Sequence, residues 1–174
     1  MKIGLIADTQ GSFDIERLVA YVGRTFVDVD EIWHAGDWGA QAVLDGLTRL
    51  GKPLVVVNGN APDDPSYPMT VERTIERRRV GMIHNLEPRR REWALGFDVL
   101  IHGHTHRWRD EMVGHTRLTN PGTATKPQFG GTERTMAIVD FAREVTVEKL
   151  VLPRFPPPRG DRRRRRQGPD MISP

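Results

Sequence analysis

Residues 2–8, KIGLIAD, form a short apolar stretch that ends in an aspartate, and the same pattern occurs twice more early in the chain. Residues 31–35, EIWHA, end in Gly36-Asp37, and residues 53–57, PLVVV, end in Asn58-Gly59-Asn60. Each stretch has the length and the β-branched content of a buried strand. We therefore predict three parallel strands, with the side chains at their carboxyl ends meeting at one edge of the sheet.

Apolar residues at helical spacing separate these three strands. Spacings of three and four place them on one face of a helix. They are Ile15, Leu18, Val19, Val22 and Phe26 in the first helix and Ala42, Val43, Leu47 and Leu50 in the second. Ser12 or Asp14 can cap the first helix. The β-α-β-α-β alternation predicts right-handed crossovers between the parallel strands.

The sequence after Pro68 changes to short β-favouring stretches, with one predicted helix at residues 90–95. The stretches cover residues 69–75, 79–84, 99–102, 111–113, 116–119, 136–141 and 145–152. This pattern predicts a second sheet packed against the first, rather than further alternation of strand and helix.

The chain has 174 residues, of which 37% are hydrophobic and none is cysteine. This size predicts one globular domain whose core needs no covalent staples. The lack of cysteine excludes a disulfide scaffold, a zinc finger and a thiol nucleophile, so a metal must bind to nitrogen and oxygen ligands. The first apolar stretch is too short for a signal peptide or a membrane span, and we expect a cytoplasmic protein. The sequence contains no heptad repeat, so it does not indicate an oligomeric state.

The basic character of the chain is concentrated at its C-terminus. Residues 153–174 hold seven arginines against two aspartates, so they carry a net charge of +5, whereas residues 1–152 carry −2. A segment with three consecutive prolines and five consecutive arginines cannot bury enough apolar surface to order itself. We predict a folded domain over residues 1–152 and a disordered basic tail over residues 153–174. The tail could bind nucleic acid, but we favour the alternative that it is only solvated and has no binding role.

Polar residues with metal-ligating side chains stand where successive apolar stretches end. They are Asp8, Asp37, Asn60, His84, His104 and His106. Any one of them alone is more typical of a turn or a helix cap. Together at converging strand ends they would repel one another unless a cation lay among them. Imidazole and carboxylate without thiolate suit manganese, iron, zinc or nickel.

These residues lie in motifs that resemble the calcineurin-like metallophosphoesterases, and in particular their small bacterial and archaeal phosphodiesterase branch. In chain order the motifs are Asp8-Thr9-Gln10-Gly11, Gly36-Asp37, Gly59-Asn60, His84, Gly103-His104-Thr105-His106 and Asn120-Pro121-Gly122-Thr123. The resemblance spans residues 1–152. It implies an α/β fold of two stacked mixed β-sheets flanked by helices, a four-layer αββα sandwich.

The resemblance also implies a site with two divalent metal ions. In it, Asp8 and His106 hold one metal ion, with Gln10 beside them, and Asp37 bridges to the second. Asn60, His84 and His104 hold the second ion, which is manganese by preference, with nickel, iron or zinc as alternatives. Such a pair turns a shared water into hydroxide and orients it toward the phosphorus. The catalytic residues implied are Asp37, Asn60 and His104.

Three positions depart from the family pattern. Gln10 stands where the family has histidine, and an amide oxygen is a weaker metal donor than imidazole. Ala61 follows Asn60 where a histidine often protonates the leaving group, so this help is missing. Asn85 replaces a glycine after His84, and asparagine can adopt the left-handed backbone that a glycine turn needs.

Two functions from different classes follow from these residues. We favour a metal-dependent phosphoesterase, more specifically a phosphodiesterase, acting on a small phosphate ester or a nucleotide. The alternative is a binding or scaffold module that keeps the fold and has lost efficient catalysis, as Gln10 and Ala61 suggest. The retromer subunit of the same branch is such a scaffold.

Several other residues carry weaker hypotheses. His34 and His102 are interpreted as core or supporting residues, Asp63 and Asp64 as turn residues, and Trp38 as either core or pocket wall. Basic residues flank His84 at Arg73, Arg77, Arg78, Arg79, Arg89, Arg90 and Arg91, where we favour a solvated face over a substrate contact.

Overall fold

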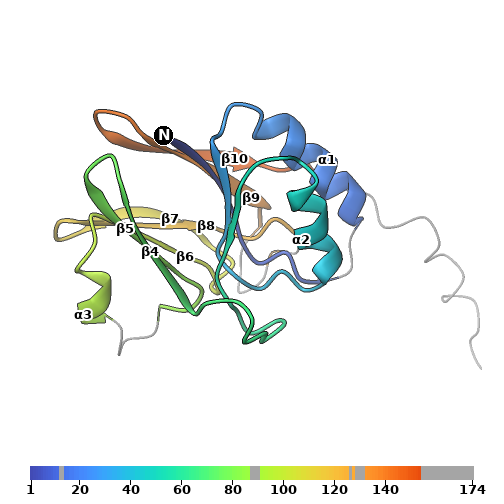
Figure 1. Ribbon diagram of the computed structural model, residues 1–174, viewed down its shortest axis with the longest axis horizontal. Helices are drawn as coiled ribbons and strands as arrows, with labels where there is room; N and C mark the ends of the chain where they lie inside the picture. The colour runs from blue at the N-terminus through green and yellow to red at the C-terminus, as the bar shows by residue number, and fades with distance from the viewer. Residues whose placement is uncertain (12–13, 87–90, 126, 128–131, 154–174) are drawn as a thin grey trace, which may run out of the picture.

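The computed structural model describes residues 1–11, 14–86, 91–125, 127 and 132–153, which form two five-stranded sheets stacked face to face (Figure 1). Along the chain the elements are β1 (Lys2–Ile6), α1 (Ile15–Thr25), β2 (Glu31–His34), α2 (Gln41–Thr48), β3 (Leu54–Val56), β4 (Thr70–Ile75), β5 (Arg78–Ile83), α3 (Arg91–Ala94), β6 (Val99–His102), β7 (Trp108–Val113), β8 (Thr116–Pro121), β9 (Thr135–Phe141) and β10 (Val145–Val151). The strand orders are β10-β9-β1-β2-β3 and β4-β5-β6-β8-β7.

The first sheet contains the predicted parallel strands. β1 pairs with β2 and β2 with β3, all parallel, and α1 and α2 are the connecting crossovers. Helix α1 begins at one of the two predicted caps, where the Asp14 carboxylate accepts a hydrogen bond from the backbone N–H of Arg17 at 3.1 Å. The β-α-β-α-β prediction is confirmed.

The second sheet is formed by five of the seven predicted later stretches, as β4 to β8. The last two stretches were also predicted to join it, and this is wrong: β9 and β10 lie in the first sheet. β9 pairs antiparallel with β1 on the edge opposite β2, and β10 pairs with β9. Both sheets are therefore mixed. β1 has an open edge opposite β2, and the unpaired N–H and C=O groups of that edge are available to pair with β9.

Side chains fill three interfaces between four layers. Between the sheets lies a cluster that includes Leu5, Trp33, Met82 and Ile101. The outer face of the first sheet packs against α1 and α2, which contribute residues such as Leu18 and Val43. On the outer face of the second sheet, Ala94 of α3 packs with Phe97, Leu100 and Leu118. The αββα sandwich is confirmed, and Figure 1 shows α3 against one sheet and the other two helices beyond the other.

Within the described residues, no helix is long and apolar enough to cross a membrane. Residues 154–174 of the predicted basic tail lie outside the described part of the chain, so its disorder stays a prediction.

Candidate metal centre

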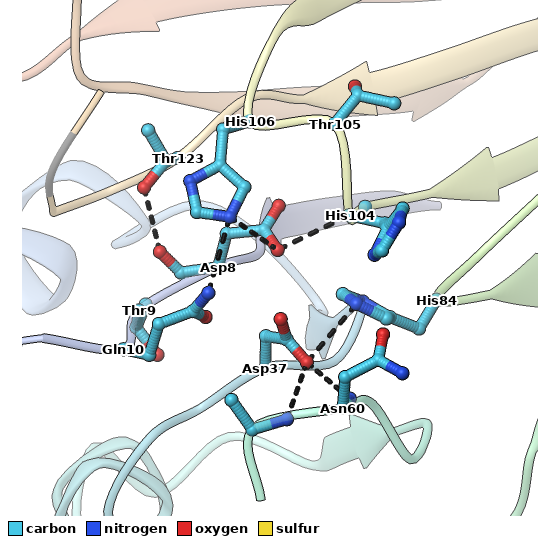
Figure 2. Close-up of polar contacts among 12 residues, drawn as sticks. Asp8, Thr9, Gln10, Asp37, Asn60, His84, His104, Thr105, His106 and Thr123 are labelled. Atoms are coloured by element: carbon cyan, nitrogen blue, oxygen red, sulfur yellow. Dashed lines mark hydrogen bonds and ion pairs between the residues drawn. The ribbon is translucent and has the colours of Figure 1, made fainter. Parts of the chain in front are cut away.

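The carboxyl ends of the strands that run parallel in each sheet meet at one place. The six predicted strand-end residues gather there (Figure 2). Asp8, Asp37 and Asn60 follow β1, β2 and β3 of the first sheet. His84 follows β5, and the segment from His104 to His106 follows β6, in the second sheet. The stacking of the two sheets brings residues from opposite halves of the chain into one cluster.

The backbone at this cluster is in a conformation that side chains rarely adopt. Of the six described non-glycine residues with positive φ, four are predicted ligands: Asp8 at 52°, Asp37 at 57°, His104 at 68° and His106 at 55°. The left-handed region is sparsely populated for residues other than glycine, and such strain concentrates at functional sites. The turn at each strand end therefore aims these side chains out of the strand direction.

Gly59 gives the Asp37 carboxylate room. A Cβ at position 59 would lie 2.3 Å from Asp37 Oδ1 and 2.4 Å from its backbone nitrogen. Any side chain at residue 59 would push this carboxylate away. The Gly-Asn pair after β3 is thus required by packing as well as by the chemistry of Asn60.

Asp8, Asp37 and His106 each offer a ligand atom, and these atoms all lie within 4.8 Å of one another. Asp8 Oδ1 lies 3.5 Å from His106 Nε2 and accepts a hydrogen bond from the backbone N–H of His104 at 3.2 Å. Asp8 Oδ2 is buried and has no hydrogen-bond partner among the described residues. A buried carboxylate oxygen without a partner is costly, and a cation would satisfy it.

Asp37 contacts both halves of the cluster. Its Oδ1 accepts hydrogen bonds from the backbone N–H groups of Asn60 at 2.5 Å and Ala61 at 2.9 Å, and lies 3.1 Å from His84 Nε2. Burial alone would raise the pKa of Asp37, but the hydrogen bond and positive charge of His84, with the two backbone donors, lower this pKa to about 2. Asp37 is therefore a carboxylate at neutral pH.

The ring of His84 is oriented by the first sheet. Its Nδ1 lies 2.8 Å from the carbonyl oxygen of Ala35, to which it donates, so Nε2 faces Asp37 and the cluster (Figure 2). Burial opposes charge on His84, but Asp37 and Asp8 raise its pKa above the usual value. The His84 and His104 rings meet edge to face with centroids 5.2 Å apart.

The electrostatics of the cluster suit a divalent cation. Burial raises the pKa of Asp8 to about 7, with His84 opposing this shift and Asp37 adding to it. The buried carboxylates of Asp8 and Asp37, the buried imidazoles of His84 and His106 and the exposed imidazole of His104 form a nitrogen and oxygen donor set of the kind that binds manganese, iron or zinc. The residues present therefore fit the metal site that the sequence predicts.

Gln10 lies at the same end of β1 and reaches this cluster. Its Nε2 lies 3.2 Å from His106 Nε2, and its Oε1 is buried without a hydrogen-bond partner in the described part of the chain. The amide thus occupies the edge of the site where the family pattern has an imidazole. The Oε1 atom of Gln10 is the donor that this side chain offers to a cation.

Sequence reasoning missed a set of hydrogen bonds that holds the loops around the cluster. Asn120 Nδ2 donates to the Gly103 carbonyl at 2.8 Å and to Thr105 Oγ1 at 3.1 Å, while its Oδ1 accepts from the Gly122 N–H at 2.8 Å. Thr123 Oγ1 donates to the Asp8 carbonyl at 2.7 Å. The Asn120-Pro121-Gly122-Thr123 motif was the available signal. Its residues position the segments that carry Asp8 and His104.

The two supporting histidines lie where they were predicted. His34 is fully buried, with Nε2 2.9 Å from Thr9 Oγ1, and burial lowers its pKa to about 3. His102 is buried beside the Gly103 carbonyl, 3.1 Å from its Nδ1, and burial lowers its pKa to about 4. Both rings are neutral at pH 7 and lie beneath the loops that bear the predicted ligands.

The remaining candidates have structural roles. Asp63 accepts a hydrogen bond from Asn58 Nδ2 at 2.7 Å, and Asp64 accepts from Ser66, so both stabilise their own loop. Trp38 is buried against Tyr67, with centroids 4.7 Å apart, and is a core residue. Arg73 pairs with Glu31, and Arg78 donates to the carbonyl of Arg143. Arg89 and Arg90 lie outside the described residues.

The chain is thus an αββα sandwich with a cluster of histidine and aspartate, suited to metal binding, at its converging strand ends. Residues 1–144 match the model of the calcineurin-like phosphoesterase superfamily domain. The chain belongs to this family.

Curated relatives agree with this assignment. A probable metallophosphoesterase of Methanothermobacter thermautotrophicus is 36% identical over 145 residues, covering 74% of this chain and 80% of that protein. A second one, from Methanocaldococcus jannaschii, is 34% identical over 137 residues, covering 74% of this chain and 70% of that protein.

Solved structures share the fold at lower identity. An archaeal phosphodiesterase aligns with a TM-score of 0.74 and 23% identity, covering 87% of this chain and all of that one. Wild-type Vps29 from Entamoeba histolytica, in complex with zinc, aligns with a TM-score of 0.64 and 19% identity, covering 87% and 99%. At these identities the likeness establishes the fold alone.

Proposed function

We propose that this phosphoesterase hydrolyses phosphodiesters at the cluster of Asp8, Asp37 and His106, with two divalent cations. One observation carries the proposal: the donor atoms of these three side chains lie within 4.8 Å of one another. Asp37, which belongs to this set, also contacts His84 at 3.1 Å. Manganese is the first candidate metal, with nickel, iron or zinc as alternatives.

Each predicted ligand has a role in this proposal. Asp8 and His106, with the Gln10 amide, would hold the first cation. His84, His104 and Asn60 would hold the second, and Asp37 would contact both. When bound, the cations would supply hydroxide from water at neutral pH and would neutralise the charge that develops on the phosphoryl oxygens. The protein then needs no nucleophile of its own.

The chain positions these groups before substrate arrives. The two backbone N–H donors from residues 60 and 61 fix the Asp37 carboxylate, and the Ala35 carbonyl fixes the His84 ring. Asn60 contributes a neutral oxygen, which adds no further negative charge to a site with two carboxylates. His104 is exposed, so its ring is accessible to a substrate.

The leaving group receives less help than in the family pattern. Ala61 donates its backbone N–H to Asp37, and its methyl side chain has no acidic proton to give to a leaving group. General acid catalysis typically contributes about 10²–10⁴-fold where it exists. We therefore expect faster turnover of esters whose leaving groups are weak bases, such as nitrophenolate, than of alkyl esters.

The test is hydrolysis of bis-p-nitrophenyl phosphate and p-nitrophenyl phosphate with added Mn²⁺. Asp37→Asn should abolish hydrolysis, whereas Asp45→Asn, the same change at an exposed position of α2, should leave the rate unchanged. A preference for the diester would support the phosphodiesterase assignment. Full activity in Asp37→Asn would contradict the proposal.

The second candidate is a catalytically weakened binding or scaffold module. The contact between Gln10 and His106 favours it, because a weak first metal site would impair hydrolysis. Under this alternative, no activity appears with manganese, nickel, zinc or iron, and Gln10→His restores some. A small phosphate ester or nucleotide is the substrate in our favoured proposal. The cytoplasmic location rests on sequence alone and stays a prediction.

A further inference from the structure

A cavity of about 560 Å³ opens beside the candidate metal centre, on the side of His104. It is lined by His102, His104, Thr105, Arg107, Trp108 and Arg109. This volume is within the range of pockets that hold small organic ligands. Because His104 lines it, a phosphate ester bound at the centre has room to extend into this cavity.

The lining of the cavity is basic. Arg107 and Arg109 are two residues apart where β7 begins, and neither Asp nor Glu is among the residues that line it. Arg109 pairs with Glu111, whose side chain is 53% exposed. Ion pairs this exposed contribute little to stability, so the Arg109 guanidinium can exchange Glu111 for a stronger anionic partner.

Two of the residues that line the cavity, His102 and Thr105, are held in place by burial or by hydrogen bonds. His102 is buried, and Thr105 Oγ1 accepts hydrogen bonds from Asn120 Nδ2 at 3.1 Å and from the backbone N–H of Arg107 at 3.4 Å. The backbone that carries the two arginines is thus tied to the loop that carries His104. The backbone positions of the two arginines are therefore defined relative to the metal centre.

We infer that this cavity binds a second phosphate group of the substrate, remote from the ester that is cleaved. The inference rests on the proposed phosphodiesterase function and adds a substrate class: phosphodiesters with a further phosphate on the retained sugar or alcohol. Guanidinium groups match phosphate because planar N–H donors pair with two of its oxygens. A phosphate group offers the two guanidinium groups an anionic partner, which a neutral hydroxyl at the same place does not.

The test compares two substrates that differ by one phosphate: thymidine 5′-(p-nitrophenyl phosphate) with and without a 3′-phosphate. In the wild-type protein with Mn²⁺, the 3′-phosphate should raise kcat/KM by about tenfold, the effect of one charge-assisted hydrogen-bond pair. The ratio should fall to about one in Arg107→Gln/Arg109→Gln. Using a ratio within each protein cancels differences in metal content and folded fraction.

The control is Arg24→Gln, which makes the same arginine-to-glutamine change once, against twice in the double variant, at an exposed residue in the last turn of α1. Its ratio should equal that of the wild-type protein. The inference is overturned if the 3′-phosphate gives no gain in the wild-type protein, if the gain survives in the double variant, or if Arg24→Gln removes it equally.

A binding measurement separates this inference from the proposed function. Calorimetric titration with thymidine 3′,5′-bisphosphate and with thymidine 5′-phosphate needs no turnover. The bisphosphate should bind about tenfold more tightly to the wild-type protein and no more tightly to the double variant. If no ester is hydrolysed but this difference holds, the proposed hydrolysis fails and the phosphate site stands. Equal binding of the two nucleotides overturns the site.

Discussion

The side-chain amide of Gln10 lies with Nε2 3.2 Å from Nε2 of His106, across 96 residues of sequence. An amide nitrogen can only donate, so in this arrangement it takes up the lone pair with which His106 would bind a cation. If the amide is turned over, Oε1 faces the ring instead. In the orientation shown by the structure, the amide must turn before His106 Nε2 can bind a metal; once turned, Oε1 is a donor beside that nitrogen.

Gln10→His should therefore strengthen the first metal site. Imidazole is a better donor to manganese than an amide oxygen, and it ends the competition for His106. We expect the affinity for Mn²⁺ to rise about tenfold or more, measured by calorimetric titration of chelator-treated protein. Gln41→His, which adds the same side chain at an exposed position of α2, should not change the affinity. An unchanged or weaker affinity in Gln10→His would contradict this interpretation.

Metal should stabilise the fold, because it relieves the repulsion between Asp8 and Asp37. At a free concentration about 100 times Kd, a ligand adds about 2.7 kcal/mol to the free energy of unfolding. For a chain of this size that corresponds to a rise in Tm of roughly 5–10 °C. Thermal unfolding with Mn²⁺ and with chelator measures it. Asp37→Asn should lose most of the rise and Asp45→Asn none; equal shifts in both would argue against a site at Asp37.

Asn120 should matter for stability although it is not a predicted ligand. Asn120→Ala leaves the Gly103 carbonyl, the Thr105 hydroxyl and the Gly122 N–H without this partner, which costs about 2–3 kcal/mol. Urea unfolding measures the loss. Asn120→Asp keeps the acceptor for Gly122 but loses both donors, so it should not rescue the protein. If the free energy of unfolding of Asn120→Ala is within about 0.5 kcal/mol of that of the wild type, Asn120 does not have this role.

The protein without metal should lose stability in acid partly through His34. Burial lowers the pKa of His34 to about 3, below the usual 6.5, so between these values the unfolded chain binds a proton that the folded chain does not. This contribution to the free energy of unfolding is complete above pH 6.5 and is lost as the pH falls, by up to about 1.4 kcal/mol per pH unit.

Urea unfolding of His34→Gln between pH 8 and pH 4.5 isolates that contribution. Although the variant is less stable at pH 8, its difference from the wild type should shrink as the pH falls. His115→Gln, which makes the same substitution at an exposed turn, is the matched control. Parallel curves for His34→Gln and the wild type would contradict a neutral, buried His34.

Strand positions and the ends of strands were predictable because they depend on neighbouring residues. Alternation between β-branched stretches and Gly, Asp or Asn breakers predicts the extents of β1, β2 and β3 within about two residues. The same local signals placed Asp8, Asp37 and Asn60 at strand ends. The cap of α1 at Asp14 followed from one side chain and the next turn of backbone.

Contacts between distant parts of the chain were not predictable in this way. Nothing local to residues 135–151 indicates that β9 joins β1 rather than the second sheet, since that choice depends on which edge is free after the other strands pair. The contact of Gln10 with His106 and the hydrogen bonds of Asn120 also depend on the stacking of the two sheets.

Some properties of the site thus follow from the local sequence, and others follow only from the tertiary structure. The types of ligand and their places at strand ends are properties of the local sequence, because side-chain identity and chain-breaking propensity act over a few residues. The distances among Asp8, Asp37 and His106, and the basic cavity beside His104, arise only when the sheets stack. Burial then removes water from the carboxylates and imidazoles, and their mutual distances decide which of them can share a cation.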